Sequence, residues 1–177
     1  MYKNLTKPTR CGFADLLSNK KTIKKFKKAT PPDWLISGIK DISNKIIKQQ
    51  TQNNLYLVEI DTKTKNKMAQ ASEAMYKRLS NNSDNPIDIA KLNALSNYSL
   101  FFIKAPTVFA VIQNTNSSTS TTSLINIIEE VAFLKSQNLE FHEISTQLIA
   151  QKEFSQILHL KDNQTVLTLI AAGYPQE

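Results

Sequence analysis

Hydrophobic residues recur every three or four positions between Trp34 and Ile47, the spacing that places side chains on one face of a helix. This pattern predicts an amphipathic helix of about fifteen residues. The segment Thr30-Pro31-Pro32-Asp33 marks its start, because a threonine cap is followed by prolines suited to the first helical turn. The polar run Gln49–Asn54 ends it.

The stretches that follow alternate between strand-like and helical patterns. Runs rich in β-branched and aromatic residues predict strands at Leu55–Ile60, at Leu100–Ile112 with Pro106 near its start, and at Thr165–Ala172. Helical spacing predicts helices at Lys63–Leu79, Ile89–Asn97, Ser123–Gln137 and from His142 or Ser145 to Leu158. Their order predicts an α+β layered fold with a small central sheet flanked by long helices, in one domain spanning residues 1–177.

Composition excludes several kinds of site. The chain has only three glycines, Gly12, Gly38 and Gly173, from which no glycine-rich phosphate loop can be built. Its single cysteine, Cys11, excludes an internal disulfide and a CxxC pair. The two histidines, His142 and His159, have no cysteine near them, so we expect no metal site. No catalytic acid, base or nucleophile is identified.

Neither a membrane span nor a signal peptide is expected. No apolar run approaches the roughly 20 residues that a bilayer requires. The first ten residues are polar and lack the apolar segment of a secretory signal. We therefore expect a cytoplasmic protein with no membrane partner.

Positive charge is concentrated at the N-terminus. Residues 1–30 contain nine Lys/Arg and one Asp, whereas the remaining residues contain thirteen basic and fourteen acidic side chains. The centre of this element is Lys20–Phe26, sequence KKTIKKF, whose ammonium groups and threonine hydroxyl suit a phosphate. A solvated lysine-rich loop, a nucleotide phosphate, a nucleic acid and a membrane surface all remain compatible with charge alone.

Three separated motifs, taken together, resemble the nitroreductase family of FMN-dependent oxidoreductases. Lys20–Phe26 is similar to the family's Arg-Arg-Ser-x-Arg-x-Phe, with lysine for arginine and threonine for serine. The segment Gln50–Val58 is similar to Asn-x-Gln-Pro-Trp-x-Phe-x-Val. Ala105-Pro106 and Gly173-Tyr174-Pro175 match the family's strand-initiating Ala-Pro and closing Gly-Tyr-Pro. The resemblance covers roughly residues 13–175 and identifies the chain as a short, divergent member.

This resemblance implies an FMN-dependent oxidoreductase that takes a hydride from NAD(P)H and reduces a nitroaromatic or quinone-like acceptor. It also implies a homodimer with FMN at the subunit interface. By the same resemblance, the cofactor-binding residues are Lys20, Lys21, Thr22, Lys24, Gln50 and Gln52. Lys20 and Lys24 would supply cations to the phosphate and ring, Thr22 a hydroxyl donor, and the two glutamines hydrogen bonds to the ribityl chain or ring.

Departures from the family pattern keep a second hypothesis open. Ile46-Ile47 stand where the family has Pro-Ser, and Asn53-Asn54 stand where it has Pro-Trp. The family's Gly-Leu-Gly turn is replaced by a segment around Asn138-Leu139. A protein that keeps the fold and the homodimer, binds no flavin and acts as a binding or regulatory protein would show these same losses.

Nucleic-acid binding is a third alternative, supported only by the charge of the N-terminal element. No aromatic-interleaved surface or recognition helix accompanies that element. We therefore expect no nucleic-acid partner. Phe26 and Trp34 are expected to anchor the hydrophobic core.

Overall fold

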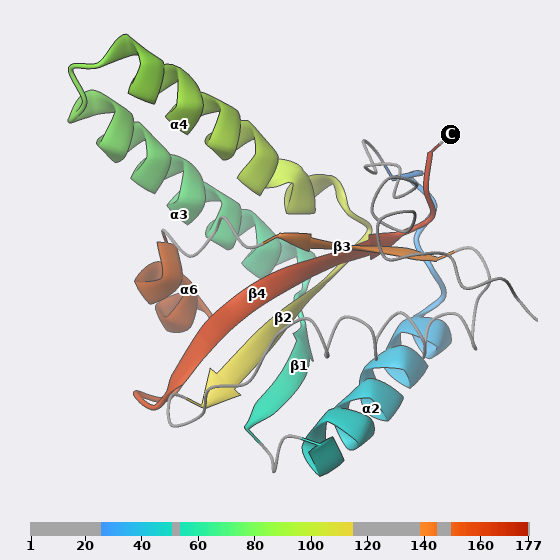
Figure 1. The fold of residues 1–177 in the computed structure, drawn as a ribbon. Helices are drawn as coiled ribbons and strands as arrows, with labels where there is room; N and C mark the ends of the chain where they lie inside the picture. Colours follow the sequence, from blue (N-terminus) through green and yellow to red (C-terminus); the bar gives the residue numbers. More distant parts are fainter. Residues whose placement is uncertain (1–25, 51–53, 115–138, 145–149, 177) are drawn as a thin grey trace, which may run out of the picture.

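A four-stranded antiparallel sheet lies at the centre of the chain (Figure 1). The structure, a computed structural model, describes residues 26–50, 54–114, 139–144 and 150–176. The spatial order of the strands is β1-β2-β4-β3, so β1 and β3 form the edges. The strands are β1 (Leu55–Glu59), β2 (Thr107–Asn114), β3 (Glu140–Ile144) and β4 (Gln164–Gly173).

Strand β2 is buried on both faces from Thr107 to Ile112, which explains the unbroken apolar run Val108–Ile112. Phe109 and Val111 belong to one hydrophobic core, whereas Val108, Ala110 and Ile112 belong to the other. Successive side chains of a strand point to opposite faces. The sheet therefore separates two cores, and helices cover both of its faces.

Helix α2 (Asp33–Gln50) covers the first face (Figure 1). Its residues Leu35, Ile36, Ile39 and Ile47 are buried against the sheet, as the helical spacing predicted. The helix predicted from Trp34 is confirmed and continues three residues beyond Ile47.

Helices α3 (Thr62–Asn81) and α6 (Gln151–Ile157) pack on the opposite side with the 3-10 helix η1 (Leu100–Lys104). Asp61 caps α3: its Oδ1 accepts a hydrogen bond from the Thr64 amide at 2.9 Å. Met68, Phe102 and Phe154 contribute the large side chains of this core. The predicted α+β class, with a small sheet and long helices, is confirmed.

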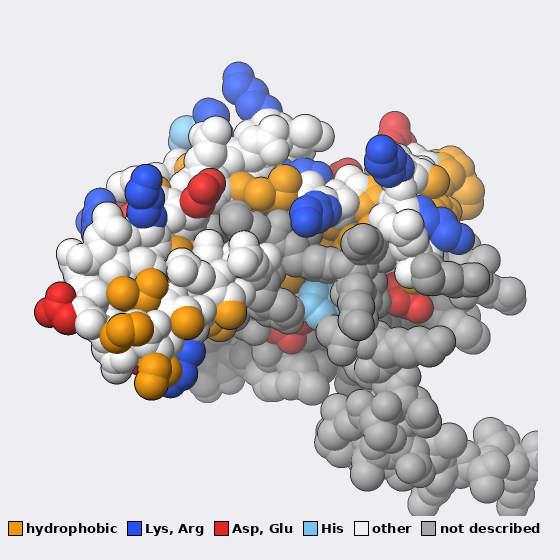
Figure 2. Space-filling view, turned by 90° about the horizontal axis from the view of Figure 1, so that it is seen from above, with side chains coloured by type: hydrophobic (Ala, Val, Ile, Leu, Met, Phe, Trp, Pro, Cys, Tyr) orange, Lys and Arg blue, Asp and Glu red, His pale blue; other side chains and the backbone are white. Residues whose placement is uncertain are grey.

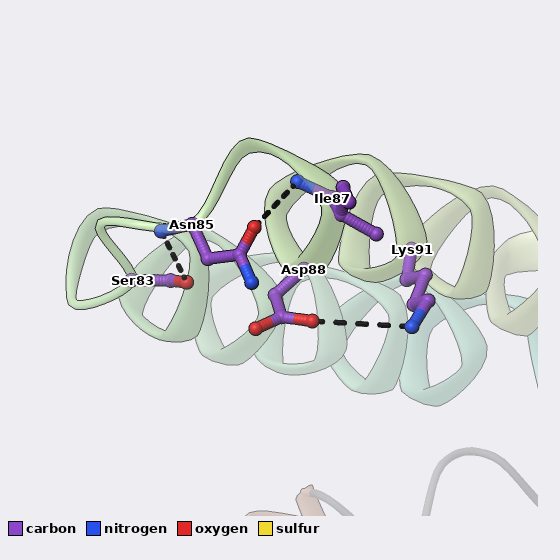
Figure 3. A network of polar contacts seen from close by, with 5 residues as sticks. All are labelled: Ser83, Asn85, Ile87, Asp88 and Lys91. Atoms are coloured by element: carbon purple, nitrogen blue, oxygen red, sulfur yellow. Dashed lines mark hydrogen bonds and ion pairs between the residues drawn. The ribbon is translucent and has the colours of Figure 1, made fainter.

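Helix α4 (Pro86–Ser99) folds back along α3 as a hairpin (Figure 1). Asn85 starts it, because its Oδ1 accepts a hydrogen bond from the Ile87 amide at 3.0 Å while Pro86 occupies the first turn. Figure 3 shows this start and the exposed contact between Lys91 and Asp88, whose charged atoms lie 4.0 Å apart. The helix begins three residues before the predicted Ile89.

Two predicted elements exist, as strand β2 and helix α6, but the start predicted for each of them is wrong. Leu100–Ile103 is not the beginning of a strand, since η1 prolongs α4 and ends where Pro106 disfavours further helix. Residues from His142 do not begin a helix, because Glu140–Ile144 forms strand β3 on β4, with Phe141 opposite Ala172. The helix predicted at Ser123–Gln137 lies outside the described residues.

In the described part of the chain, no helix combines the length and the apolar character needed to cross a membrane.

Candidate functional site

The predicted cofactor residues fall almost entirely outside the described part of the chain. Lys20, Lys21, Thr22 and Lys24 precede Phe26, and Gln52 lies between α2 and β1. Gln50 is the last residue of α2, and its side chain is outside the described set. Their roles stay predictions, and the structure describes only residues next to them in the sequence.

Phe26, the aromatic residue that closes the lysine run, is anchored at one end of the sheet. Its side chain is 7% exposed and belongs to the core beneath α3. Phe26 pairs with Pro175 as an isolated antiparallel bridge. The next amide, that of Lys27, donates a 2.8 Å hydrogen bond to the Tyr174 carbonyl. The expectation that Phe26 anchors the core is confirmed.

Gly173 and Pro106 complete this contact. A Cβ atom built on Gly173 would lie 2.8 Å from Phe26 Cδ1 and 2.8 Å from Pro106 Cδ. Phe26 and Pro106 thus pack directly onto the backbone at the end of β4. We call Phe26, Pro106 and Gly173 the Phe26 anchor; it brings together three segments that were singled out separately in the sequence.

Lys65 supports the anchor from α3. Its side chain is 7% exposed, and Nζ donates a 2.7 Å hydrogen bond to the carbonyl of Ala105, immediately before Pro106. Burial lowers the pKa of the Lys65 ammonium below its ordinary 10.5. Among the described residues, no carboxylate forms an ion pair with it.

Sequence reasoning missed Lys65, although a signal was present. Lys65 lies on the buried face of α3 together with Met68, Ala69, Ser72 and Tyr76. A lysine within an apolar stripe is unusual, because a charged side chain is rarely buried without a partner.

The segment with Gln50 and Gln52, called the glutamine segment below, directly precedes β1 in the sequence, and β1 begins at the other end of the sheet. Leu55, which follows that segment, pairs with Gln113, and the Asn54 carbonyl accepts a 2.9 Å hydrogen bond from the Asn114 amide. The Phe26 anchor instead adjoins Thr107, six residues away along β2. At about 3.3 Å per residue, the two flanks lie about 20 Å apart along the strand.

Asn44 fixes the edge of β1 near this second flank. Its Oδ1 accepts a 2.6 Å hydrogen bond from the Leu57 amide, and its Nδ2 donates a 3.1 Å bond to the Leu57 carbonyl. One side-chain amide thereby occupies both main-chain groups of Leu57, which an added strand would otherwise use.

Apolar side chains remain exposed at two places. Trp34 is 68% exposed and Ile42 37% exposed on α2, so the expectation that Trp34 anchors the core is wrong. Leu79, Ile87 and Leu95 are exposed on the α3–α4 hairpin. Figure 2 shows hydrophobic side chains gathered over the end of that hairpin.

Two surface concavities lie away from the Phe26 anchor. A concavity of about 540 Å³ lies beside α6, and another of about 450 Å³ lies between α2 and β1. Neither is lined by Phe26, Pro106 or Gly173. No group of three or more potential metal ligands occurs among the described residues.

Comparison with known proteins gives a clear result only for structure. No protein-family model matches the sequence, and no curated protein is similar to it. Among solved structures, a BluB-like flavoprotein from Clostridium difficile 630 matches with a TM-score of 0.68 at 16% identity, over 93% of this chain and 90% of the other. The FMN and NADPH-dependent nitroreductase NfnB from a Sphigopyxis strain matches with a TM-score of 0.66 at 11% identity, over 92% and 88%. The chain has the nitroreductase fold.

A third match to this nitroreductase fold extends its range of chemistries. Iodotyrosine deiodinase, in a structure bound to FMN and 3-iodo-L-tyrosine, gives a TM-score of 0.64 at 17% identity, over 93% of this chain and 90% of the other. The nitroreductase-like fold predicted from the motifs is therefore confirmed, whereas such low identities do not carry a reaction or a substrate with them.

Proposed function

We propose that this chain binds FMN and acts as an NAD(P)H-dependent oxidoreductase on a small nitroaromatic or quinone-like acceptor. The observation that supports it most is the Phe26 anchor, which ties the residue closing the lysine run to Pro106 and Gly173 at one end of a nitroreductase-fold sheet. Structures of this fold include proteins bound to or dependent on FMN. The expected cytoplasmic location belongs to the same proposal.

The donor set fits a flavin mononucleotide. Four lysines and one threonine hydroxyl precede Phe26, and ammonium and hydroxyl groups are suitable donors to a phosphate. Lys20 would neutralise the phosphate, Thr22 would donate a hydrogen bond to it, and Lys24 would place a cation near the ring. When bound, FMN supplies the acceptance and transfer of the hydride, while the protein binds and orients it.

Titration of FMN tests the assignment of Lys24. We expect Lys24→Met to raise the FMN dissociation constant by about tenfold or more, since a charge-assisted contact contributes roughly 1.5–3 kcal/mol. Lys28→Met is the matched control, because Lys28 is exposed and lies beyond the anchor. Equal affinities in the wild type and Lys24→Met would contradict the role of Lys24.

The separation of the two flanks supports a homodimer. Phe26, which closes the lysine run, lies at the Thr107 end of β2, whereas the glutamine segment precedes β1, which begins at the Gln113 end. A second copy related by twofold symmetry can bring the lysine run of one chain to the glutamine segment of the other. We propose that each cofactor site is shared in this way.

Mixed dimers provide a test of the shared site. Lys24→Met and Gln52→Ala are each expected to weaken FMN binding in homodimers. After the two variants are unfolded together and refolded, a mixed dimer contains one site with both native halves. About half of the dimers should then regain one wild-type site if mixing is random. Recovery of no high-affinity site would contradict sharing.

A specific observation favours the alternative of a flavin-free homodimer with a binding or regulatory role. Ile47, at a position where the family has Pro-Ser, is 0% exposed and belongs to the core beneath α2. This position serves packing and offers no hydroxyl to a cofactor. Absence of FMN binding in the wild type, with the dimer retained, would select this alternative.

A further inference from the structure

We propose that Gly173 is a positioning residue, whose missing side chain lets Phe26 and Pro106 close on the end of β4 and so fixes the lysine run to the sheet. This inference rests on the proposed function, since the ligand held by the run is the FMN phosphate. It concerns a residue outside the predicted cofactor set.

Position 173 requires glycine because its neighbours leave no room for a Cβ atom. Gly173 does not have a positive φ, so its backbone conformation is open to other residues. A Cβ atom, however, would lie 2.8 Å from Phe26 Cδ1, 2.8 Å from Pro106 Cδ and 2.9 Å from Pro106 Cγ. These separations are far shorter than the 3.5–4.0 Å at which carbon atoms pack. Alanine therefore forces one of the two rings to move.

Pro106 is the less movable of the two neighbours. It follows Ala105, whose carbonyl accepts the 2.7 Å hydrogen bond from Lys65 Nζ and whose amide donates to the Phe102 carbonyl at 3.2 Å. It also precedes Thr107, which pairs with Ala172 in the sheet. Phe26 is held differently, through an isolated bridge to Pro175 that lies outside the strands.

Phe26 is next in the sequence to the predicted phosphate ligands, so we expect a shift of Phe26 to displace them. Lys24 is two residues before Phe26, and Lys27 is the residue after it, whose amide is held by the Tyr174 carbonyl at 2.8 Å. Charge-assisted contacts depend on donor position within a few tenths of an ångström. Loss of the Phe26 anchor is therefore expected to reduce phosphate binding without removal of any lysine.

Gly173→Ala tests the proposal, and Gly38→Ala is its control. Apart from its chain neighbours and the backbone of its own helix, a Cβ at Gly38 in the middle of α2 would meet no described atom within 4 Å. Two quantities are measured in each variant: the dissociation constant for FMN, and the hydrogen-exchange protection of the Lys27 amide relative to amides in the centre of β2. The second quantity needs no cofactor.

For Gly173→Ala we expect a dissociation constant raised by about tenfold or more and loss of protection at Lys27, while β2 amides keep theirs. Gly38→Ala is expected to change neither quantity. Unchanged affinity and unchanged Lys27 protection in Gly173→Ala would overturn the inference. Equal loss of protection at Lys27 and throughout β2 would also overturn it, because the effect would then be general unfolding.

Phe26→Ala keeps the test decisive if Gly173→Ala fails to fold. Phe26→Ala deletes the aromatic ring, whereas Gly173→Ala fills the space into which the ring packs. Both changes remove the same contact, so we expect the same weaker FMN binding. In Phe26→Ala/Gly173→Ala the two effects should be less than additive, since both act through one contact. Fully additive effects would overturn the inference. A wild type that binds no FMN would refute the proposed function, and the Lys27 exchange would still decide whether Gly173 holds the run in place.

Discussion

Lys65 is the buried charge whose energetic consequences are easiest to isolate. Its buried ammonium donates a hydrogen bond to the Ala105 carbonyl, and among the described residues no carboxylate forms an ion pair with it. Burial disfavours the charged form, so the folded-state pKa of Lys65 lies below 10.5. Below that folded-state pKa both the folded and the unfolded chain carry the proton, and the folded state bears the full cost of the buried charge.

The stability of the protein should therefore rise with pH because of Lys65. Between the lowered folded-state pKa and 10.5, the unfolded chain binds more protons than the folded chain, so the free energy of unfolding increases with pH in that window. We expect the wild type to gain stability relative to Lys65→Met as the pH rises from neutral toward 10.5, measured by urea unfolding.

Lys67→Met is the control for this effect, since Lys67 lies on α3 and is exposed. The difference between the wild type and this control should not increase with pH in the same way. A difference between the wild type and Lys65→Met that stays constant, or falls, would show that Lys65 is not desolvated in the folded protein.

At the scale of elements, the outer edge of β1 depends on Asn44. Its amide forms hydrogen bonds with both main-chain groups of Leu57. We expect Asn44→Ala to lower the free energy of unfolding by about 1–2 kcal/mol, because two partly buried hydrogen bonds are lost. Urea unfolding with an unchanged m-value is the appropriate measurement.

Lys45→Ala, at the adjacent exposed position of α2, is expected to change stability by no more than about 0.5 kcal/mol. If Asn44→Ala were as stable as this control, the paired hydrogen bonds to Leu57 would contribute nothing to the fold. Self-association of Asn44→Ala, without that of Lys45→Ala, would be a second sign that the edge had been uncovered.

Elements with a strong pattern could be predicted from the sequence. Helix α2 has both a start signal and one apolar face, and the run in β2 is buried on both sides of the sheet. Strand β3 could not be predicted, because Glu140 and Glu143 leave it only two buried apolar residues and its partner β4 comes twenty residues later. Pairing with β4 overrides the weak local preference.

The strand predicted at Leu100–Ile103 was wrong for a different reason. Such a short apolar run is compatible with a strand or a buried helix, and periodicity alone does not separate the two. The outcome depended on α4, from which η1 continues, and on the proline at position 106. Local sequence was also insufficient for the site. The motifs singled out the segments that contain Phe26, Pro106 and Gly173, but the contact between Phe26 and Gly173 depends on tertiary packing.

At the scale of the whole molecule, exposed apolar residues on α2 support association of two copies. Trp34 is 68% exposed and Ile42 lies two helical turns farther along. We expect Trp34→Arg to shift the protein from dimer to monomer in light scattering at micromolar concentration, since a charge at an apolar interface is costly to bury. Ile87→Arg, with 64% exposure on α4, is the control and should remain dimeric.

A dimer that persists in Trp34→Arg would place the interface elsewhere than on this face of α2. A monomeric wild type would contradict the homodimer itself, and with it the sharing of each FMN site between two chains.

We propose that this nitroreductase-fold chain holds FMN. The visible absorption spectrum of the purified protein, taken again after incubation with excess FMN and desalting, tests this proposal without any variant. We predict a flavin band that stays with the protein and bleaches when NAD(P)H is added. A spectrum without retained flavin under both conditions would contradict the oxidoreductase and leave the lysine run as an anion site of another kind.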